Sequence, residues 1–393
     1  MYQIAESNDG ALFYSDYQEI RQGKKIHHPT LEYQTGSIRN DFDFGQLLLF
    51  RNDSFQQVVA QMNTDYRFAA LYELRLSISR LGKIVHIPET LYTVQPTDLR
   101  LSGEKQFDYV DPANREVQLE MEAVCTAHLQ AIGAWLAPEF QRIDFGQENF
   151  AREASVIIPV RNRKRTIAEA VESALQQQTD FSFNVIVVDN HSTDGTGQIL
   201  TELSRRYPNL IHHIPASTEL GIGGCWTEAI LLPECGKFAI QLDSDDLYKD
   251  CHVLQRIVDT FYQENCAMVI GSYQMVDFKL EEIPPGLIAH REWTPDNGRN
   301  NALRINGLGA PRAFYTPVLR QIKFPNVSYG EDYATALAIS RKYLIARIYD
   351  PLYLCRRWEE NSDHDLDIQQ LNNYNFYKDK IRTLEIQARI SGK

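Results

Sequence analysis

The stretch that decides the fold is QLDSDD at residues 241–246, which follows the apolar run FAI at 238–240. A short apolar run that ends in clustered acids is typical of a buried parallel strand. Such a strand delivers its carboxylates to the carboxyl edge of the sheet, where open α/β sheets bind ligands. Negative charges this close repel one another unless a cation lies between them. A hard divalent cation that itself holds a phosphate relieves the repulsion. The stretch therefore predicts a metal–phosphate site, with a solvated turn as the simpler alternative.

The chain on either side of this stretch alternates between predicted strands and helices. The predicted strands are residues 154–160, 183–188, 210–214 and 238–242, and the helices between them are 167–177, 197–206 and 223–232. The strands are apolar runs, and the helices carry apolar residues at helical spacing. Repeated strand–helix–strand units build a parallel sheet with crossover helices. Acidic and hydroxyl residues follow the strands, where a nucleotide would lie.

Four motifs in this region stand in the order and at the spacing of one enzyme family. They are SVIIPVRN at 155–162, VDNHSTDGT at 188–196, LDSDD at 242–246 and GED at 330–332. Residues 154 to about 360 thus resemble family two of the glycosyltransferases, which are inverting enzymes that use nucleotide-sugar donors on a GT-A fold. The resemblance implies an α/β fold of the GT-A type, with a Rossmann-like, mostly parallel sheet and flanking helices.

The resemblance also implies roles for individual residues. Asp243 and Asp245 would form the DxD motif that meets the donor ribose and a divalent cation, Mn²⁺ or Mg²⁺, with Asp245 the more direct ligand. Asp332 falls where the family keeps its general base. Further residues implied at the nucleotide-sugar site are Pro159, Arg161, Asn162, Asp189, Asn190, Ser192 and Ser244. Weaker expectations for the acceptor or the pyrophosphate are Gly309, Glu331, Arg356 and Arg357.

The sequence departs from the family pattern in three places. The family often has a second carboxylate after Asp189, where this chain has Asn190. The family's Arg-Asn pair is replaced by Trp-Thr at 226–227, so the nucleobase stays open, with a UDP-sugar favoured. Near the end, RRW at 356–358 replaces the family's Arg-x-His and removes a third metal ligand, although His364 lies six residues on.

The chemistry of glycosyl transfer agrees with this set of residues. A bound cation neutralises the charge that develops on the leaving pyrophosphate. One carboxylate on the opposite face of the sugar accepts the acceptor's proton, which gives inversion by direct displacement. A nucleotidyltransferase is the alternative enzyme, but it would need a Gly-rich loop where RNRKR at 161–165 has no glycine. A non-catalytic sugar- or nucleotide-binding subunit is the non-enzymatic alternative.

The first hundred residues resemble part of the predicted catalytic domain. Residues 71–80 match residues 332–341 at a shift of 261 (332 − 71), and Tyr92 matches Tyr353 at the same shift. One ungapped register indicates an internal repeat, with chance similarity as the alternative. Residues 1–100 are therefore predicted to be a partial GT-A-like α/β half-domain. Ala70-Leu71 stands where the other copy has Glu331-Asp332, so this copy lacks the base and would serve as a scaffold, an acceptor subsite or a dimer surface.

Four segments are predicted: the half-domain at 1–100, a helical linker at 101–150, the catalytic domain at 151–360 and a C-terminal helix at 361–393. A long helix is expected over 109–137, and another over 365–390. The second would pack one face against the protein, with membrane-surface docking as the alternative. That alternative depends on four basic residues, which are Lys378, Lys380, Arg382 and Arg389.

Composition limits the partners. A net charge of −12 and a pI near 5.4 disfavour nucleic-acid binding. The chain has no apolar stretch long enough to span a membrane and no signal-peptide pattern. Six cysteines without a CxxC pair favour free thiols in a reducing cytoplasm. A cytoplasmic enzyme is expected, with peripheral membrane attachment and homodimer formation left open, acting on a saccharide or lipid-linked acceptor in cell-surface polysaccharide or glycolipid synthesis.

Overall fold

The structure, a computed structural model, describes residues 1–21, 23–62, 65–96, 108–146, 148–358 and 366–392 of the 393-residue chain. The chain forms two compact units. Unit 1 combines Met1–Ala137, Glu292–Asn306 and Ser362–Lys393, and unit 2 combines Pro138–Arg291 and Gly307–Asn361. The four predicted domains therefore stay a prediction, because the units also bring together segments that are far apart in the sequence.

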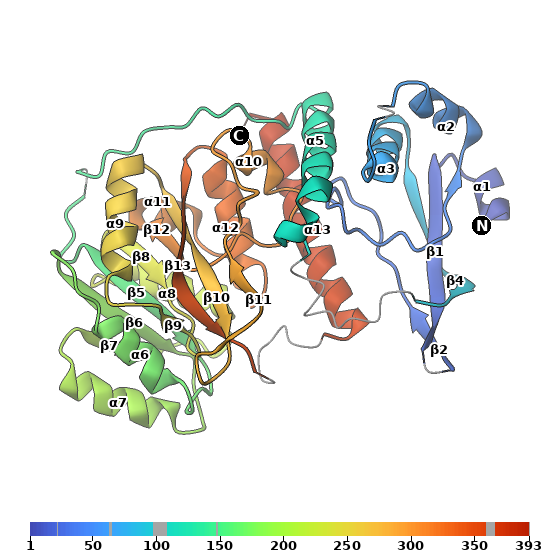
Figure 1. The fold of residues 1–393 in the computed structure, drawn as a ribbon. Coiled ribbons are helices and arrows are strands. Elements are labelled where there is room, and N and C mark those ends of the chain that lie inside the picture. Colours follow the sequence, from blue (N-terminus) through green and yellow to red (C-terminus); the bar gives the residue numbers. More distant parts are fainter. Residues whose placement is uncertain (22, 63–64, 97–107, 147, 359–365, 393) are drawn as a thin grey trace. The chain divides into compact units, whose positions relative to one another are not determined.

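The first half of unit 2 is a parallel sheet whose strands alternate with helices, as predicted (Figure 1). Its strands lie in the order β7-β6-β5-β8 and are all parallel. The elements are β5 (Ala154–Val160), α6 (Ile167–Leu175), β6 (Phe183–Asp189), α7 (Thr196–Arg206), β7 (Leu210–His213), α8 (Ile222–Leu231) and β8 (Phe238–Gln241). The order reverses between β5 and β8, and such a switch point is where open α/β sheets bind ligands.

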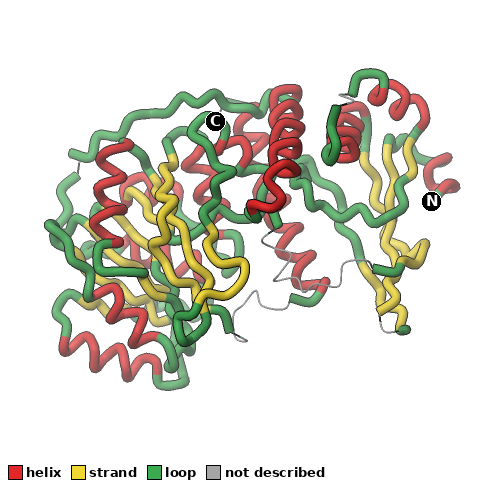
Figure 2. The backbone as a smooth tube through the Cα atoms, in the orientation of Figure 1, coloured by secondary structure: helices red, strands yellow, loops and turns green. Residues whose placement is uncertain are grey.

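The apolar composition of these strands explains their position. Val156, Ile157 and Ile158 of β5 are completely buried, and so are Val185 to Val188 of β6. Strands that are apolar on both faces must be covered on both sides, which is the usual situation of a parallel sheet. Helices α6 and α8 pack on both strands, and the tube drawing shows helices flanking the sheet (Figure 2).

The second half of unit 2 extends the same sheet with mixed strands. Strand β12 is antiparallel to β8 and to β10, and β13 is parallel to β10. Strands β9 and β11 add antiparallel pairs to β13 and β10. The elements are β9 (Leu247–Tyr248), α9 (Val253–Glu264), β10 (Met268–Val276), β11 (Glu282–Ile288), β12 (Arg312–Tyr315), α11 (Thr316–Ile322), α12 (Glu331–Ser340) and β13 (Ile345–Arg356).

Unit 1 contains a smaller, four-stranded sheet together with several helices. Strand β1 lies between β4, which is parallel to it, and the antiparallel strands β2 and β3. The elements are α1 (Tyr2–Glu6), β1 (Leu12–Arg21), β2 (Lys24–His28), β3 (Leu49–Phe50), α2 (Asn52–Val59), α3 (Ala70–Leu81), β4 (Ile84–Val94), η1 (Pro112–Asn114), α5 (Arg115–Ala131), α10 (Gly298–Asn301) and α13 (Ile368–Ile390). Among the described residues of both units, no helix is long and apolar enough to cross a membrane.

The strand pairing of unit 1 repeats that of unit 2. In unit 1, Leu12 pairs with Ile84 and Tyr17 with Tyr92. In unit 2, Met268 pairs with Ile345 and Tyr273 with Tyr353. The shift is 256 residues between β1 and β10 (268 − 12 and 273 − 17) and 261 between β4 and β13 (345 − 84 and 353 − 92). Both pairs also change register between these two positions. The paired strands therefore agree with the predicted repeat.

The repeat continues beyond these strands and then stops. Strand β3 pairs with β1 as β12 pairs with β10, and α3 begins 261 residues before α12 (331 − 70). In unit 2, however, β12 also pairs with β8, and β13 with β9. The described part of unit 1 has no counterpart of either pairing. The sheet of unit 1 thus repeats the pairing of β10, β12 and β13 without counterparts of β8 and β9 among the described residues.

Two predicted helices differ from those observed. In place of the helix expected over 109–137, the structure has the shorter helix α5, which follows the 3₁₀ turn η1. The C-terminal helix α13 begins at Ile368, three residues later than expected, and its buried face is rich in charged residues. Its buried residues are Lys378, Asp379, Ile381, Arg382, Glu385, Ile386 and Arg389. Three of the four basic residues that supported membrane docking are therefore buried. Only Lys380 is exposed.

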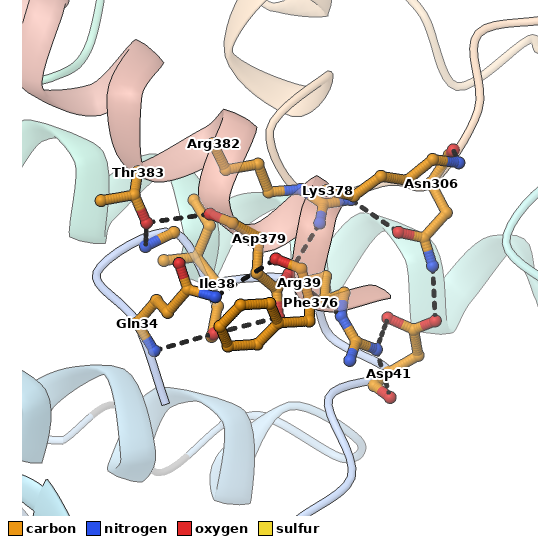
Figure 3. A network of polar contacts seen from close by, with 12 residues as sticks. Gln34, Ile38, Arg39, Asp41, Asn306, Phe376, Lys378, Asp379, Arg382 and Thr383 are labelled. Carbon is orange, nitrogen blue, oxygen red and sulfur yellow. Dashed lines mark hydrogen bonds and ion pairs between the residues drawn. The ribbon is translucent and has the colours of Figure 1, made fainter. Parts of the chain in front are cut away.

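Charged groups on α13 can be buried because they form ion pairs and hydrogen bonds with one another and with loops of unit 1 (Figure 3). The carboxylate of Asp379 accepts hydrogen bonds from Ser37, Arg39 and Arg382, at 3.0, 3.2 and 2.8 Å. Arg382 also donates to the Ile305 carbonyl at 2.9 Å. Helix α13 therefore ties the N-terminal residues to the segment 292–306.

The arginines of the segment 292–306 hydrogen-bond to other parts of unit 1. Arg299 donates to the Ala137 carbonyl at 2.8 Å, and Arg304 donates to Asn301 and to Asn40 at 2.7 Å each. Trp293 is buried. These side chains therefore hold unit 1 together.

We expect Asp379→Ala to destabilise unit 1 by about 3–5 kcal/mol, because it leaves the buried guanidinium groups of Arg39 and Arg382 without their shared counter-charge. The free energy of unfolding from a urea titration measures the loss. The control is Lys380→Ala on the exposed side of the same helix, which should change that free energy by less than about 0.5 kcal/mol. Equal effects of the two substitutions would contradict the structural role of the network.

Candidate functional site

The acidic stretch lies directly after β8, at the carboxyl edge of the sheet. The Asp243 N–H donates to the Tyr353 hydroxyl at 2.8 Å, and its Oδ1 accepts from Gln241 Nε2 at 2.9 Å. The Thr166 hydroxyl donates to the Ser244 carbonyl at 2.9 Å. The backbone of the turn is therefore fixed by β13 on one side and by the segment before α6 on the other.

Three carboxylates share this turn, and their charges oppose one another. Burial raises the pKa of Asp245, and the charge of Asp243 adds to the rise, whereas Arg163 and Trp358 offset only part of it. Burial likewise raises the pKa of Asp246, with further contributions from Asp245 and Asp243. A divalent cation with oxygen ligands would remove this repulsion, so the donor set fits the expected Mn²⁺ or Mg²⁺.

Cationic and N–H groups surround Asp245. Its Oδ2 accepts from Trp358 Nε1 at 3.2 Å and lies 3.7 Å from Nε of Arg163. The Arg163 guanidinium lies 5.8 Å from the centre of the Trp358 ring. Trp358 stands where the family often has a histidine, so an N–H donor replaces a potential metal ligand. His364, the other candidate, lies outside the described residues. Among those described, no group of three or more His, Cys, Asp or Glu side chains is arranged to hold a metal ion.

Arg356 is buried beside the acidic turn, with 1% of its surface exposed. Its N–H donates to Asp246 Oδ1 at 2.8 Å, and its guanidinium contacts the Asp245 carbonyl and Glu169. The buried Nη2 has no hydrogen-bond partner among the described residues. A buried cationic donor of this kind suits an anionic ligand such as a diphosphate. The N–H of the neighbouring Arg357 donates to the Val276 carbonyl at 2.9 Å.

The ends of β5 and β6 meet through side-chain contacts. The Asn162 N–H donates to the Ser192 hydroxyl at 2.9 Å, and Asn162 Oδ1 accepts from the Thr193 N–H at 2.8 Å. Asn162 has a positive φ of 55°, a left-handed conformation that asparagine tolerates. Pro159, on the strand before it, is partly buried, and Arg161 is exposed. These contacts join the two loops into one edge.

Asp189 and Asn190 lie at the end of β6 with different surroundings. Asp189 is 2% exposed and accepts from the Ser192 N–H at 2.9 Å, with His212 at 3.3 Å. Burial raises its pKa, but the hydrogen bonds from His212 and Ser192 outweigh burial and hold the pKa below its usual value. Asn190 donates to the Leu220 carbonyl at 2.7 Å, and its buried Oδ1 has no hydrogen-bond partner among the described residues. That oxygen is an acceptor for a ligand N–H.

The residues of the Glu-Asp pair point to different partners. Glu331 is the first residue of α12, and a Cβ added at Gly223 of α8 would lie 2.9 Å from its Cβ, so Glu331 packs against that helix. Asp332 instead forms an ion pair with Nη1 of Arg312, and their side chains are 23% and 20% exposed. Both residues are partly buried, and Asp332 is the one whose carboxylate contacts Arg312.

Arg312 and Gln241 connect Asp332 to the acidic turn. Nε of Arg312 donates to Gln241 Oε1 at 2.8 Å, and the Gln241 amide donates to Asp243 Oδ1 at 2.9 Å. The sequence analysis missed Arg312, which belongs to none of the family motifs. Gln241 stands inside the quoted stretch, but only the pairing of β12 with β8 shows its role. Gly309, three residues before Arg312, has a φ of 100° that favours glycine.

Comparisons with known proteins show that the chain is similar to glycosyltransferases. Residues 155–322 match the model of Glycosyl transferase family 2. An uncharacterized glycosyltransferase of Nostoc sp. is 32% identical over 31% of this chain and 37% of its own length. Poly(ribitol-phosphate) beta-glucosyltransferase of Bacillus spizizenii is 24% identical over 57% of this chain and 35% of its own. The putative teichuronic acid biosynthesis glycosyltransferase TuaG of Bacillus subtilis is 26% identical over 49% and 74%.

Solved structures give weaker likenesses. S. aureus TarS in complex with UDP-GlcNAc has a TM-score of 0.46 at 23% identity, covering 60% of this chain and 72% of that one. The mannosyltransferase PcManGT from Pyrobaculum calidifontis, in complex with GDP-Man and Mn²⁺, has a TM-score of 0.42 at 16% identity, covering 71% and 84%.

The matched residues include β5, the acidic turn after β8, and Arg312. The chain spans little more than a third of the first two relatives named above, so the match describes this part of the protein and not the whole of each relative. Residues 155–322, with the strand order and the acidic edge described here, are a Glycosyl transferase family 2 domain.

Proposed function

We propose that the protein transfers a sugar, with inversion, from a nucleoside-diphosphate donor to an acceptor hydroxyl. The observation that carries the proposal is the continuous set of contacts from Asp243 through Gln241 and Arg312 to Asp332. It connects the candidate donor-binding acids to the partly exposed, ion-paired carboxylate of Asp332. A single displacement needs a donor site and a base that are positioned on the same sugar.

The donor would lie across the ends of β5, β6 and β8. Asp243 and Asp245 would hold a divalent cation, which supplies charge neutralisation for the leaving diphosphate. Arg356 offers a buried guanidinium donor to the same group. Asn190 Oδ1 would accept from an N–H of the nucleobase, such as the imide N–H of uracil in a UDP-sugar.

The acceptor hydroxyl would approach from the side of α12. Asp332 lies in the first turn of this helix and would take the proton of the hydroxyl as it attacks. Relatives named for poly(ribitol phosphate) and teichuronic acid support a role in cell-surface polysaccharide synthesis. A cytoplasmic location, possible attachment to a membrane surface and a homodimer stay predictions from the sequence.

Removal of the cation should weaken nucleotide binding, because the acidic turn repels the diphosphate unless its charge is balanced. Calorimetric titration of UDP, with Mn²⁺ and then with a chelator, measures the affinity in each condition, and GDP tests the choice of base. The same affinity with and without the cation would show that Asp243 and Asp245 do not hold a metal.

Asp332→Asn should lower turnover by at least ~10²-fold while nucleotide binding stays nearly intact, because the amide keeps the shape but cannot accept the proton. Asp245→Asn should instead weaken binding of UDP with Mn²⁺, because it removes a ligand. Initial rates and calorimetry separate the two effects.

Glu331→Gln is the matched control for Asp332→Asn, since Glu331 is adjacent but packs against α8. It should retain most of the turnover. If Glu331→Gln abolishes turnover and Asp332→Asn retains it, the base has been assigned to the wrong member of the pair.

A further inference from the structure

Two arginines flank one buried residue on the acceptor side of unit 2. Ile270 of β10 pairs with Arg312 of β12 on one side and with Arg347 of β13 on the other. Side chains of residues paired across neighbouring strands project to the same face of a sheet. Neighbouring strands lie about 4.8 Å apart, so the Cα atoms of the two arginines are separated by roughly 10 Å. Both side chains therefore project to one face of the sheet, where Arg312 is partly exposed and the guanidinium nitrogens of Arg347 are buried.

The segment before β12 also approaches Arg347. A Cβ added at Gly309 would lie 3.3 Å from Nη1 of Arg347 and 2.9 Å from Cδ2 of His290. Gly309 is three residues before Arg312, so the Arg347 guanidinium extends toward the segment that carries Arg312. In a protein with a net charge of −12, Arg312, Arg347 and His290 are basic residues on or beside one short stretch, Gly309 to Arg312.

The ion pair of Arg312 with Asp332 engages the carboxylate that the proposed mechanism needs. The other contact of the guanidinium is with the neutral amide oxygen of Gln241, at 2.8 Å. One fifth of the Arg312 side chain is exposed, so an incoming molecule can reach it. An anion that bound Arg312 would compete with Asp332 for the guanidinium and leave the carboxylate free to meet a hydroxyl.

We propose that Arg312, supported by Arg347, binds a phosphate group of the acceptor next to the hydroxyl that is glycosylated. Guanidinium groups bind tetrahedral phosphate through paired N–H donors, and two of them on one sheet face can hold one phosphate between them. The acceptor would thus release the base that it needs, and an uncharged polyol would leave Asp332 paired. This inference depends on the proposed glycosyl transfer and names the acceptor class for that site.

The first test needs no substitution. With UDP and Mg²⁺ saturating, binding of glycerol 3-phosphate, glycerate and glycerol to the full chain is followed by ligand-observed NMR titration. Glycerol 3-phosphate should bind at least ~10-fold more tightly than glycerol, the ratio expected when a charge-assisted contact is gained. Equal binding of glycerol 3-phosphate and glycerol would overturn the inference. Equal binding of glycerate and glycerol 3-phosphate would overturn the assignment of phosphate.

Substitutions then locate the contact. Arg312→Gln should abolish the preference for glycerol 3-phosphate over glycerol, and Arg312→Lys should retain part of it because the charge remains without the fork. The matched control is Arg205→Gln, at an exposed arginine near the end of α7, which should keep the full preference. A preference that survives Arg312→Gln in protein that still binds UDP would show that Arg312 only orients Asp332.

UDP affinity, measured on the same samples, separates this inference from the proposed function. If UDP does not bind the unsubstituted protein, glycosyl transfer itself is contradicted. If UDP binds and glycerol 3-phosphate is not preferred, the donor site stands and only the acceptor assignment fails.

Discussion

Repulsion among three neighbouring carboxylates is the constraint on which the rest of unit 2 depends. Asp243, Asp245 and Asp246 follow a completely buried strand, and burial raises the pKa of the last two. The fold answers with N–H groups from β13 and the residues after it: the backbone N–H of Arg356 donates to Asp246, and Trp358 Nε1 donates to Asp245. These contacts, with the bond from the Asp243 N–H to the Tyr353 hydroxyl, require β13 to lie against the turn after β8.

The corresponding strand pairs of the two units place one tyrosine in different surroundings. Tyr353 and Tyr92 occupy equivalent places in the paired strands of the two units. The Tyr353 hydroxyl accepts from the N–H of Asp243, whereas the Tyr92 hydroxyl accepts from the N–H of Gln46. Without a strand equivalent to β8, unit 1 has no acidic turn to hold. The same residue therefore supports a ligand site in one unit and a loop in the other.

Helix α13 stabilises unit 1 through buried ion pairs. Its buried face is made of ion pairs, with Asp379 between Arg39 and Arg382 and with Glu385 paired to Arg389 at 2.8 Å. Such a face requires each partner to be present, so it specifies which segments pack together more strictly than an apolar face does. These contacts hold the segment 292–306, which lies between β11 and β12 in the sequence. The chain leaves unit 2 where this segment begins and returns to unit 2 where it ends.

The sequence by itself determined the parallel strands, their helices and the position of the acidic turn, because apolar runs and turn residues are local signals that each segment carries alone. It also indicated the repeat, since Tyr92 and Tyr353 keep a constant spacing. Tertiary structure decided the partners: that Arg312 pairs with Asp332, that Trp358 donates to Asp245, and that α13 buries charges. These contacts join residues tens to hundreds of positions apart. From the sequence alone, a charged side chain is predicted to be exposed. It can be buried only beside a counter-charge, and the fold decides which counter-charge lies next to it.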